Sequence, residues 1–389
     1  MKYLVSIFLI FSSLFLNAQI RTGAEQTEKY FPLLQDKKVA VCGNQTSMTG
    51  NVHLVDTLVN TGIKLVKIFA PEHGFRGEAE AGAVIKSSTD PQTGVPIISI
   101  YGNNKKPTPE QMKDIDILIF DIQDVGCRFF TYISTLHYVM EAAAEAKVEV
   151  MILDRPNPNG YFVDGPILEE KYKSFVGMHQ VPVVHGMTIA EYGKMINEEG
   201  WLNNGIKCKL TLIPVENYTH SMRYKLPIAP SPNLQTEEAI YLYPSLCLFE
   251  GTEISLGRGT DIPFQVYGHP QLSIGNYYFT PEPRKGISEN PPQKGKKCRG
   301  FDLTAEAREN LNTTNSFNIK YIINAYKHFP EQNRFFSQAS FFDKLAGNST
   351  LRWQIINGKS EEEIRQSWQK ELEKFKKTRK KYLLYPDFE

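Results

Sequence analysis

The chain has 389 residues, with 44 lysines and arginines against 43 aspartates and glutamates, so its net charge is close to zero. A near-neutral chain offers no broad basic surface, which disfavours a nucleic-acid partner. The length exceeds what one hydrophobic core usually serves, so two domains are expected. The five cysteines are widely spaced and form no CxxC pair, which argues against a disulfide scaffold and favours buried thiols.

Residues 1–18 have the pattern of a signal peptide. Lys2 precedes an apolar run of about fourteen residues, Tyr3 to Leu16, which is too short to span a bilayer comfortably. We expect cleavage after Ala18; a retained N-terminal anchor is the alternative. An exported, periplasmic protein without membrane insertion after cleavage is therefore expected.

Short apolar runs alternate with helical patterns through the first half of the chain. The runs are Val39–Cys42, Leu65–Ala70, Pro96–Ile100, Ile117–Phe120 and Val148–Leu153. Helical patterns lie at Val52 to Val59, after Thr108, and from Tyr132 to Ala146. Strands that alternate with helices predict βαβ units, and therefore an α/β fold with a mainly parallel sheet.

A second part of the chain begins near residue 240. Residues 280–300 are rich in proline, lysine and glycine and are expected to form a long loop. Helical patterns dominate from Leu303 onward. Ser360 and Glu363 form a capping box that begins a helix ending at about Lys380, with an apolar face made by Ile364, Trp368, Leu372 and Phe375. We place the two domains at residues 25–237 and 240–389.

Polar residues follow the predicted strands, where open parallel sheets bind their ligands. Asn44 follows the first run, Glu72 and His73 the second, Asp121 and Asp124 the fourth, and Asp154, Arg155 and Asn157 the fifth. We expect these turns to line one site. The alternative is that polar residues simply occupy loops, as they do in most proteins.

Signatures of several other chemistries are missing from the sequence. The first βα turn lacks GxGxxG, and neither HExxH nor GxSxG occurs. We expect neither cofactor nor metal, with dispersed metal ligands as the alternative. The remaining carboxylates and arginines suit glycoside hydrolysis, in which a carboxylic acid protonates the leaving oxygen. A second carboxylate, or a neighbouring group of the sugar, then acts at the anomeric carbon.

Six ordered motifs resemble the exo-β-N-acetylmuramidase (NamZ) family, formerly a domain of unknown function. They are Phe69–Gly77, Phe120–Gly126 with Arg128 and Thr131–Tyr132, Leu153–Pro158, His185–Thr188, Pro230–Asn233, and Phe249–Thr252 with Gly257–Thr260. The resemblance covers nearly all of the chain after Lys38. It implies a Rossmann-like N-terminal domain, a smaller α+β C-terminal domain and an active-site cleft between them.

The activity implied by the resemblance is release of N-acetylmuramic acid from the non-reducing ends of peptidoglycan fragments. Phe130, Ile254 and Leu256 depart from the family pattern. Leu256 replaces a common glutamate, which bears on fine substrate preference. A non-catalytic muropeptide-binding protein and a peptidoglycan amidase or esterase are the alternative functions.

The resemblance places the family's key glutamate at Glu72, which we expect to be the general acid. Asp124 is the expected partner carboxylate, with Asp121 and Glu250 behind it. The 2-acetamido group of the sugar could instead be the nucleophile, and the carboxylate would then only orient it. The sequence does not choose between these mechanisms.

Substrate contacts are expected from two groups of residues. Arg128 and Arg258 are candidates for the lactyl carboxylate of N-acetylmuramic acid, although either could instead brace a buried aspartate. The expected polar contacts, besides the carboxylates Asp121 and Glu250, are Asn44, His73, Tyr132, Asp154, Asn157, His185 and Asn233.

Overall fold

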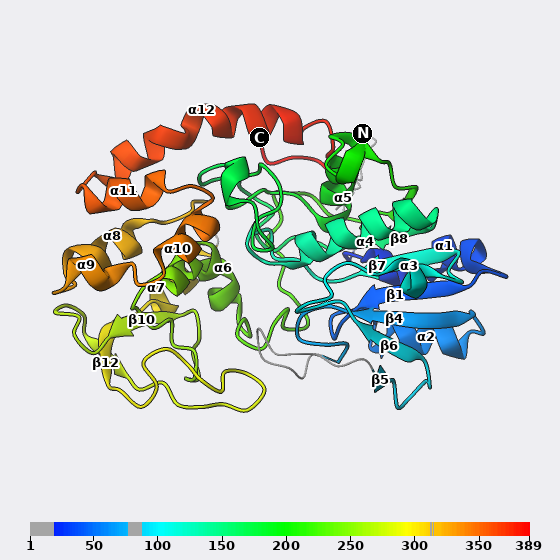
Figure 1. The fold of residues 1–389 in the computed structure, drawn as a ribbon, viewed down its shortest axis with the longest axis horizontal. Helices are drawn as coiled ribbons and strands as arrows, with labels where there is room; N and C mark the ends of the chain where they lie inside the picture. The colour runs from blue at the N-terminus through cyan, green and yellow to red at the C-terminus, as the bar shows by residue number, and fades with distance from the viewer. Residues whose placement is uncertain (1–18, 77–87, 312, 314) are drawn as a thin grey trace, which may run out of the picture.

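The computed structural model describes residues 19–76, 88–311, 313 and 315–389, so the predicted signal peptide lies outside the described residues. Figure 1 shows an N-terminal lobe built on a sheet and, beside it, a C-terminal lobe rich in helices. No helix within the described ranges is long and apolar enough to cross a membrane.

The N-terminal lobe contains a seven-stranded sheet in the order β5-β6-β4-β1-β7-β8-β9. The strands are β1 (Val39–Gly43), β4 (Leu65–Ala70), β5 (Ser88–Thr89), β6 (Pro96–Ser99), β7 (Ile117–Asp121), β8 (Glu149–Leu153) and β9 (Leu210–Ile213). All neighbours are parallel except β5, which is antiparallel to β6. Counted along the chain, the six parallel strands have the order 3-2-1-4-5-6 of a Rossmann sheet, which confirms the expected α/β fold.

Alternate residues of each strand face opposite sides of the sheet. In β1, Val39 and Val41 join one apolar core, whereas Ala40 and Cys42 join the other. The first core includes α1 (Thr27–Leu34) and α2 (Leu54–Asn60), and the second includes α4 (Tyr132–Ala146) and α5 (Ile189–Glu198). Because both faces are buried, the central strands are continuous apolar runs, and these runs predicted the strands from the sequence.

The structure adds short elements that the apolar runs did not reveal. The edge strands β5 and β9 were not predicted, because a two-residue or half-buried strand leaves little apolar pattern. The expected helix at Val52 to Val59 begins as a strand, β3 (Val52–His53), paired with β2 (Met48–Thr49). The helix after Thr108 is a single turn, α3 (Pro109–Met112). Short 3-10 turns lie at Gly23–Glu25, Glu170–Tyr172 and Asn203–Gly205.

The C-terminal lobe combines helices with a small antiparallel sheet. The sheet has the order β10-β12-β11, from β10 (Val266–His269), β11 (Tyr277–Phe279) and β12 (Cys298–Asp302). The helices are α6 (Glu237–Leu246), continued by a 3-10 turn at Cys247–Gly251, then α7 (Thr304–Asn310), α8 (Lys320–Lys327), α9 (Gln332–Phe335), α10 (Ala339–Ala346), α11 (Thr350–Ile356) and α12 (Glu361–Arg379). The expected loop at 280–300 is confirmed except that β12 begins inside it.

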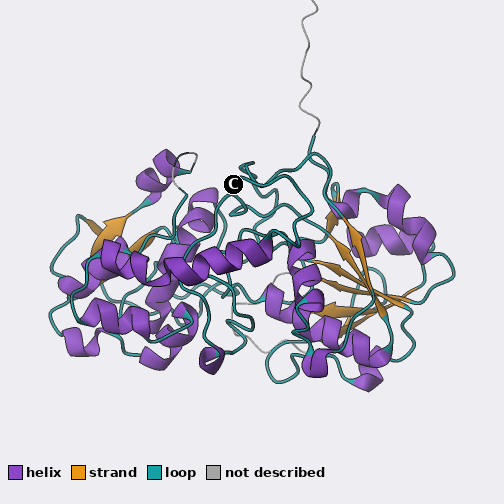
Figure 2. Ribbon diagram, turned by 90° about the horizontal axis from the view of Figure 1, so that it is seen from above, coloured by secondary structure: helices purple, strands orange, loops and turns teal. Residues whose placement is uncertain are grey.

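Helix α12 and the residues after it join the two lobes. The Ser360–Glu363 capping box and the buried apolar face of α12 are confirmed. Figures 1 and 2 show α12 extending from the C-terminal lobe toward the N-terminal lobe, where the chain ends. There the buried Arg379 donates twice to the carbonyl of Gly186, at 3.0 and 2.7 Å, and also pairs with Asp387. One apolar core runs through both lobes, and all five cysteines are buried free thiols, as expected.

Candidate active site

The strand order of the sheet reverses at β1 and β7, where Rossmann sheets usually bind ligands. In this chain, hydrogen-bonded side chains of the protein occupy that position. The Ser47 hydroxyl accepts a hydrogen bond from the backbone amide of Asn44 at 2.9 Å and donates one to the backbone carbonyl of Asp121. The fully buried Asn44 side chain accepts from Thr46 and donates to the Tyr132 hydroxyl at 2.9 Å. The predicted contact between Asn44 and substrate is therefore replaced by an internal role.

Glu72 lies one strand away, just after β4, and its carboxylate is partly exposed. The Tyr101 hydroxyl donates to Glu72 Oε1 at 2.7 Å, and the Thr131 hydroxyl donates to Oε2 at 2.8 Å. Thr131 is the N-cap of α4 but makes no capping hydrogen bond with its side chain. Its hydroxyl is directed to Glu72 instead. Sequence reasoning did not assign these two partners, although Tyr101 follows β6, the neighbour of β4.

The turn that carries Glu72 has an unusual backbone. His73 has a φ of 69°, a left-handed conformation that non-glycine residues rarely adopt, and Gly74 follows with a φ of 80°. The Gly74 amide donates to the carbonyl of Pro71 at 3.1 Å and closes the turn. Such strain is typical of functional turns that fix the direction of a side chain. His73 is itself 6% exposed, so the turn presents Glu72 more openly than His73.

Tyr132 connects Glu72 with Asp124. Its side chain is buried, and burial raises the pKa of the Tyr132 phenol; the negative charges of Glu72 and Asp124 raise this pKa further. Both carboxylates therefore lie within electrostatic range of one hydroxyl. The two predicted catalytic residues thus both act electrostatically on Tyr132, from turns that follow different strands.

Asp124 is enclosed, with 4% of its surface exposed. The Gly126 amide donates to its Oδ2 at 2.7 Å, and Nε2 of His185 lies 3.7 Å from the same oxygen. Burial raises the pKa of Asp124 to about 7. Burial, with the charges of Arg379 and Arg128, lowers the pKa of His185 to about 3, so this ring is neutral. Because its Nδ1 accepts from the Met187 amide at 3.2 Å, its proton is on Nε2, which faces Asp124.

Asp121, Asp154 and Asn157 occupy closed hydrogen-bond networks. Arg155 donates to both oxygens of Asp121, at 2.6 and 2.9 Å. Asp154 accepts from Thr188 Oγ1 at 2.7 Å, from the Ala190 amide at 2.9 Å and from the Tyr385 hydroxyl. Asn157 donates to the carbonyl of Met187 at 2.8 Å and accepts from the Asn159 amide at 2.8 Å.

These networks argue against the substrate contacts predicted for the three residues. Each of the three is at most 2% exposed, and its polar atoms are bonded within the protein. A buried polar group with satisfied hydrogen bonds stabilises the fold and presents no free group to a ligand.

Arg128 is also structural. Its guanidinium is completely buried and donates to three backbone carbonyls, those of Pro166 at 2.8 Å, Val181 at 2.7 Å and Leu345 at 2.9 Å. These bonds join segments of both lobes. Neither of the roles expected for Arg128, binding the lactyl carboxylate or bracing an aspartate, agrees with this geometry.

Glu250 and Arg258 lie in the C-terminal lobe and remain accessible. Arg258 donates from Nε and Nη2 to Glu250 Oε1, at 3.0 and 2.5 Å, and the two side chains are 20% and 25% exposed. Both line a cavity of about 390 Å³, together with Thr252, Glu253, Gln293 and Gln338.

Aromatic contacts connect this cavity with the Glu72 region. The Arg258 guanidinium lies 4.9 Å from the centre of the Phe264 ring, and Phe264 packs against Tyr243. Tyr243 in turn packs against Phe130, which directly precedes Thr131, the partner of Glu72. Asn233 joins the lobes at another point, because its side chain donates to the carbonyl of Ile287 at 2.9 Å. Packed side chains thus link the Glu72 region of one lobe with the Arg258 cavity of the other.

Comparisons with known proteins agree with this architecture. The profile of the family described as exo-β-N-acetylmuramidase NamZ matches with its N-terminal part at residues 39–238 and its C-terminal part at residues 241–385. The chain is 40% identical to the peptidoglycan β-N-acetylmuramidase NamZ of Bacillus subtilis (strain 168), over 94% of this chain and 92% of that protein.

Two crystal structures of DUF1343 family proteins from Bacteroides fragilis NCTC 9343 have the same fold. One is 48% identical with a TM-score of 0.87, over 95% of this chain and 100% of that chain. The other is 29% identical with a TM-score of 0.81, over 94% of this chain and 99% of that chain. From the two profile matches and the relative from Bacillus subtilis, we conclude that the chain belongs to the exo-β-N-acetylmuramidase NamZ family.

Proposed function

We propose that this protein is a glycoside hydrolase, an exo-acting β-N-acetylmuramidase that releases terminal N-acetylmuramic acid from peptidoglycan fragments. The observation that carries this function is the extent of its similarity to the enzyme from Bacillus subtilis, 40% identity over 94% of the chain. Both parts of the family profile also match. The geometry around Glu72 supplies a chemical basis.

Glu72 is the proposed general acid. A general acid alternates between a protonated and an ionised state, so its surroundings must accommodate both. Hydroxyl groups can donate or accept hydrogen bonds, unlike lysine or arginine, which only donate. Tyr101 and Thr131 can therefore hold the Glu72 carboxyl group in one orientation throughout the reaction.

Asp124 is the proposed positioning residue. Its burial supports a role behind the reacting atoms, since 4% exposure leaves little surface for contact with a sugar. Of the two mechanisms that the sequence left open, the burial of Asp124 favours attack by the 2-acetamido group of the substrate. Asp124 then keeps the turn before Gly126, and with it the neighbouring His185, in place.

The decisive experiment is hydrolysis of a chromogenic β-N-acetylmuramide by the purified protein. We expect release of the chromophore and of free N-acetylmuramic acid. A protein that binds muropeptides without hydrolysing any glycosidic bond would contradict the proposal. Release of stem peptide or of an ester group, with the sugar bond intact, would instead indicate the amidase or esterase alternative.

Export to the periplasm is part of the same proposal, because the substrate is a cell-wall polymer. It is supported by the apolar run from Tyr3 to Leu16 and the small residue Ala18. We expect the N-terminus of the protein recovered from a periplasmic fraction to begin at Gln19. Recovery of the uncleaved chain from the cytoplasm would contradict export.

A further inference from the structure

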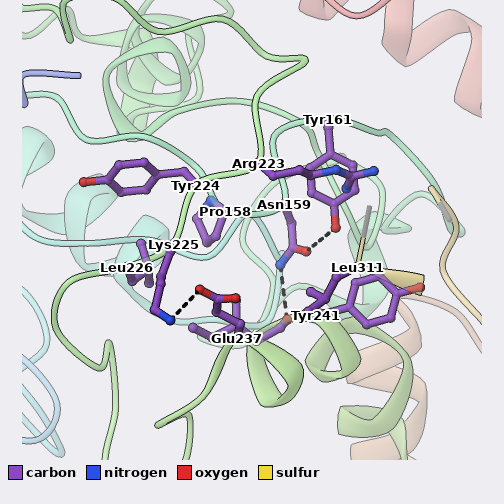
Figure 3. Close-up of a pocket in the computed structure, with 11 residues that line it drawn as sticks. Pro158, Asn159, Tyr161, Arg223, Tyr224, Lys225, Leu226, Glu237, Tyr241 and Leu311 are labelled. Atoms are coloured by element: carbon purple, nitrogen blue, oxygen red, sulfur yellow. Dashed lines mark hydrogen bonds and ion pairs between the residues drawn. The ribbon is translucent and has the colours of Figure 1, made fainter. Parts of the chain in front are cut away.

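A small pocket lies beside the lobe junction, apart from Glu72 and Arg258. It has a volume of about 180 Å³ and is lined by Tyr161, Arg223, Tyr224, Lys225, Glu237 and Tyr241, among others. Figure 3 shows these side chains around the space, with Arg223 against the ring of Tyr161 and Lys225 directed to Glu237. We call it the tyrosine–arginine pocket. Aromatic side chains with a few convergent polar groups are typical of ligand sites.

Arg223 makes no ion pair with a carboxylate among the residues that the structure describes. Its guanidinium stacks on Tyr161 and donates from Nη2 to the Asn315 side chain at 2.5 Å. Nη1 is buried and has no hydrogen-bond partner among the described residues. Lys225, by contrast, is paired with Glu237 at 3.2 Å. A partly exposed guanidinium with a neutral partner favours an anionic ligand, and a carboxylate fits its geometry best.

The pocket lies at the carboxyl edge of the sheet. Pro158 to Tyr161 follow β8, Arg223 to Leu226 follow β9, and Asn159 donates to the carbonyl of Val125, next to Asp124, at 2.9 Å. Strand β8 is three strands from β4, which is roughly 14 Å at the usual spacing of about 4.8 Å. The tyrosine–arginine pocket and Glu72 therefore follow strands that are well separated along this edge.

One segment connects this pocket with the region near Glu72. Residues 223–226 line the tyrosine–arginine pocket, and residues 228–235 line an open cavity of about 650 Å³. The second cavity also includes Gln45, which follows β1, the strand next to β4. The segment 223–235 thus contributes to both cavities, and the second cavity includes a residue that follows the strand next to β4.

We propose that the tyrosine–arginine pocket is a distal subsite that binds a carboxylate carried by the substrate beyond the cleaved bond. This inference rests on the proposed function. The carboxylate has two chemical sources in a peptidoglycan fragment, the lactyl group of a second N-acetylmuramic acid and the stem peptide. Arg223, held on the ring of Tyr161, binds the carboxylate, and the partly exposed rings of Tyr224 and Tyr241 pack against the carbon atoms around it.

The test compares Arg223→Gln with wild type on three substrates: the chromogenic β-N-acetylmuramide, a peptide-free tetrasaccharide beginning with N-acetylmuramic acid, and the same tetrasaccharide with stem peptides. The variant should lose about ten- to a hundredfold in kcat/KM on the long substrates, mainly through KM. Its rate on the chromogenic substrate should be unchanged, which also shows that it folds. Arg334→Gln, at an exposed arginine in the C-terminal lobe, is the matched control and should change none of the rates.

The pattern of losses identifies the source of the carboxylate. A loss on both tetrasaccharides supports the lactyl group, and a loss confined to the peptide-bearing one supports the stem peptide. Equal losses on all three substrates, or no loss on any, would overturn the subsite. Wild-type protein that hydrolyses none of them would refute the proposed function instead, and calorimetric binding of the same tetrasaccharides to wild type and Arg223→Gln would still test the subsite separately.

Discussion

The carboxyl ends of β4 and β8 each carry an acidic residue within two positions of a buried strand, and the two surroundings differ. Glu72, beyond β4, is partly exposed and receives hydrogen bonds from two hydroxyl groups. Asp154, directly after β8, is fully buried and receives three, one of them from the backbone. The carboxyl edge of the sheet therefore holds a reactive candidate after one strand and a structural acceptor after another.

The C-terminal residues contribute to this difference. The Tyr385 hydroxyl donates to Asp154, and the Leu384 amide donates to Glu191 at 2.7 Å, close to the start of α5. Arg379 holds the carbonyl of Gly186 nearby. The chain end thus covers the carboxyl end of β8, and Asp154 becomes part of the buried hydrogen-bond network there.

Glu72→Gln should have the largest effect. An amide cannot donate the proton that the leaving group needs, so kcat should fall about a hundredfold to ten-thousandfold, equivalent to about 2.7–5.4 kcal/mol. Substrate binding and the unfolding transition should change little. The measurement is steady-state hydrolysis of the β-N-acetylmuramide, with Glu362→Gln on the exposed surface of α12 as control. A near-wild-type rate for Glu72→Gln would remove it from the mechanism.

Asp154→Ala should lower the free energy of unfolding. Thr188, Ala190 and Tyr385 would each lose a buried acceptor, at about 1–3 kcal/mol apiece, and since such losses are not additive we expect about 3–5 kcal/mol in total. Urea unfolding followed by circular dichroism measures this change. Asp261→Ala, at an aspartate whose side chain is 89% exposed, should cost less than about 1 kcal/mol. If Asp154→Ala folds as well as wild type but loses turnover, Asp154 belongs to the active site after all.

The sequence predicted the fold better than the surroundings of the site. The central strands were predicted because burial on both faces makes each a continuous apolar run, and α12 because its cap and apolar face are local patterns. Glu72 was assigned from its motif. The roles of Asp154 and Arg128 depend on partners far along the chain, Tyr385 and the carbonyl of Leu345. A strand-end pattern contains no information about which distant segment covers it.

Asp124 provides a test that depends on pH. Its folded-state pKa of about 7 lies above the ordinary value of 3.8, so the folded protein binds this proton more tightly than the unfolded chain does. Its contribution to stability is therefore full below about pH 4 and is lost as the pH rises to about 7, by up to about 4 kcal/mol.

Asp124→Asn removes this titration. The free energy of unfolding of the wild type, relative to that of the variant, should therefore fall as the pH rises from 4 to 7. His185 titrates with the opposite sign, but it is present in both proteins and largely cancels. Urea unfolding at a series of pH values gives the difference. A difference that does not change with pH would show that folding does not raise the pKa of Asp124.

Arg258→Ala should have the smallest and most selective effect. Two of the Arg258 nitrogens are bonded to Glu250, and Nη1 makes no hydrogen bond among the residues that the structure describes. A lactyl carboxylate that enters the cavity loses water, and a charge-assisted hydrogen bond to this guanidinium would offset the loss.

Removing the guanidinium should cost about 1.5–3 kcal/mol, or ten- to a hundredfold in kcat/KM, for a β-N-acetylmuramide. An uncharged β-N-acetylglucosaminide should be affected little, as should both substrates in the control Arg334→Ala. Equal losses on the two sugars would mean that Arg258, like Arg128, holds the protein together and does not distinguish the substrate.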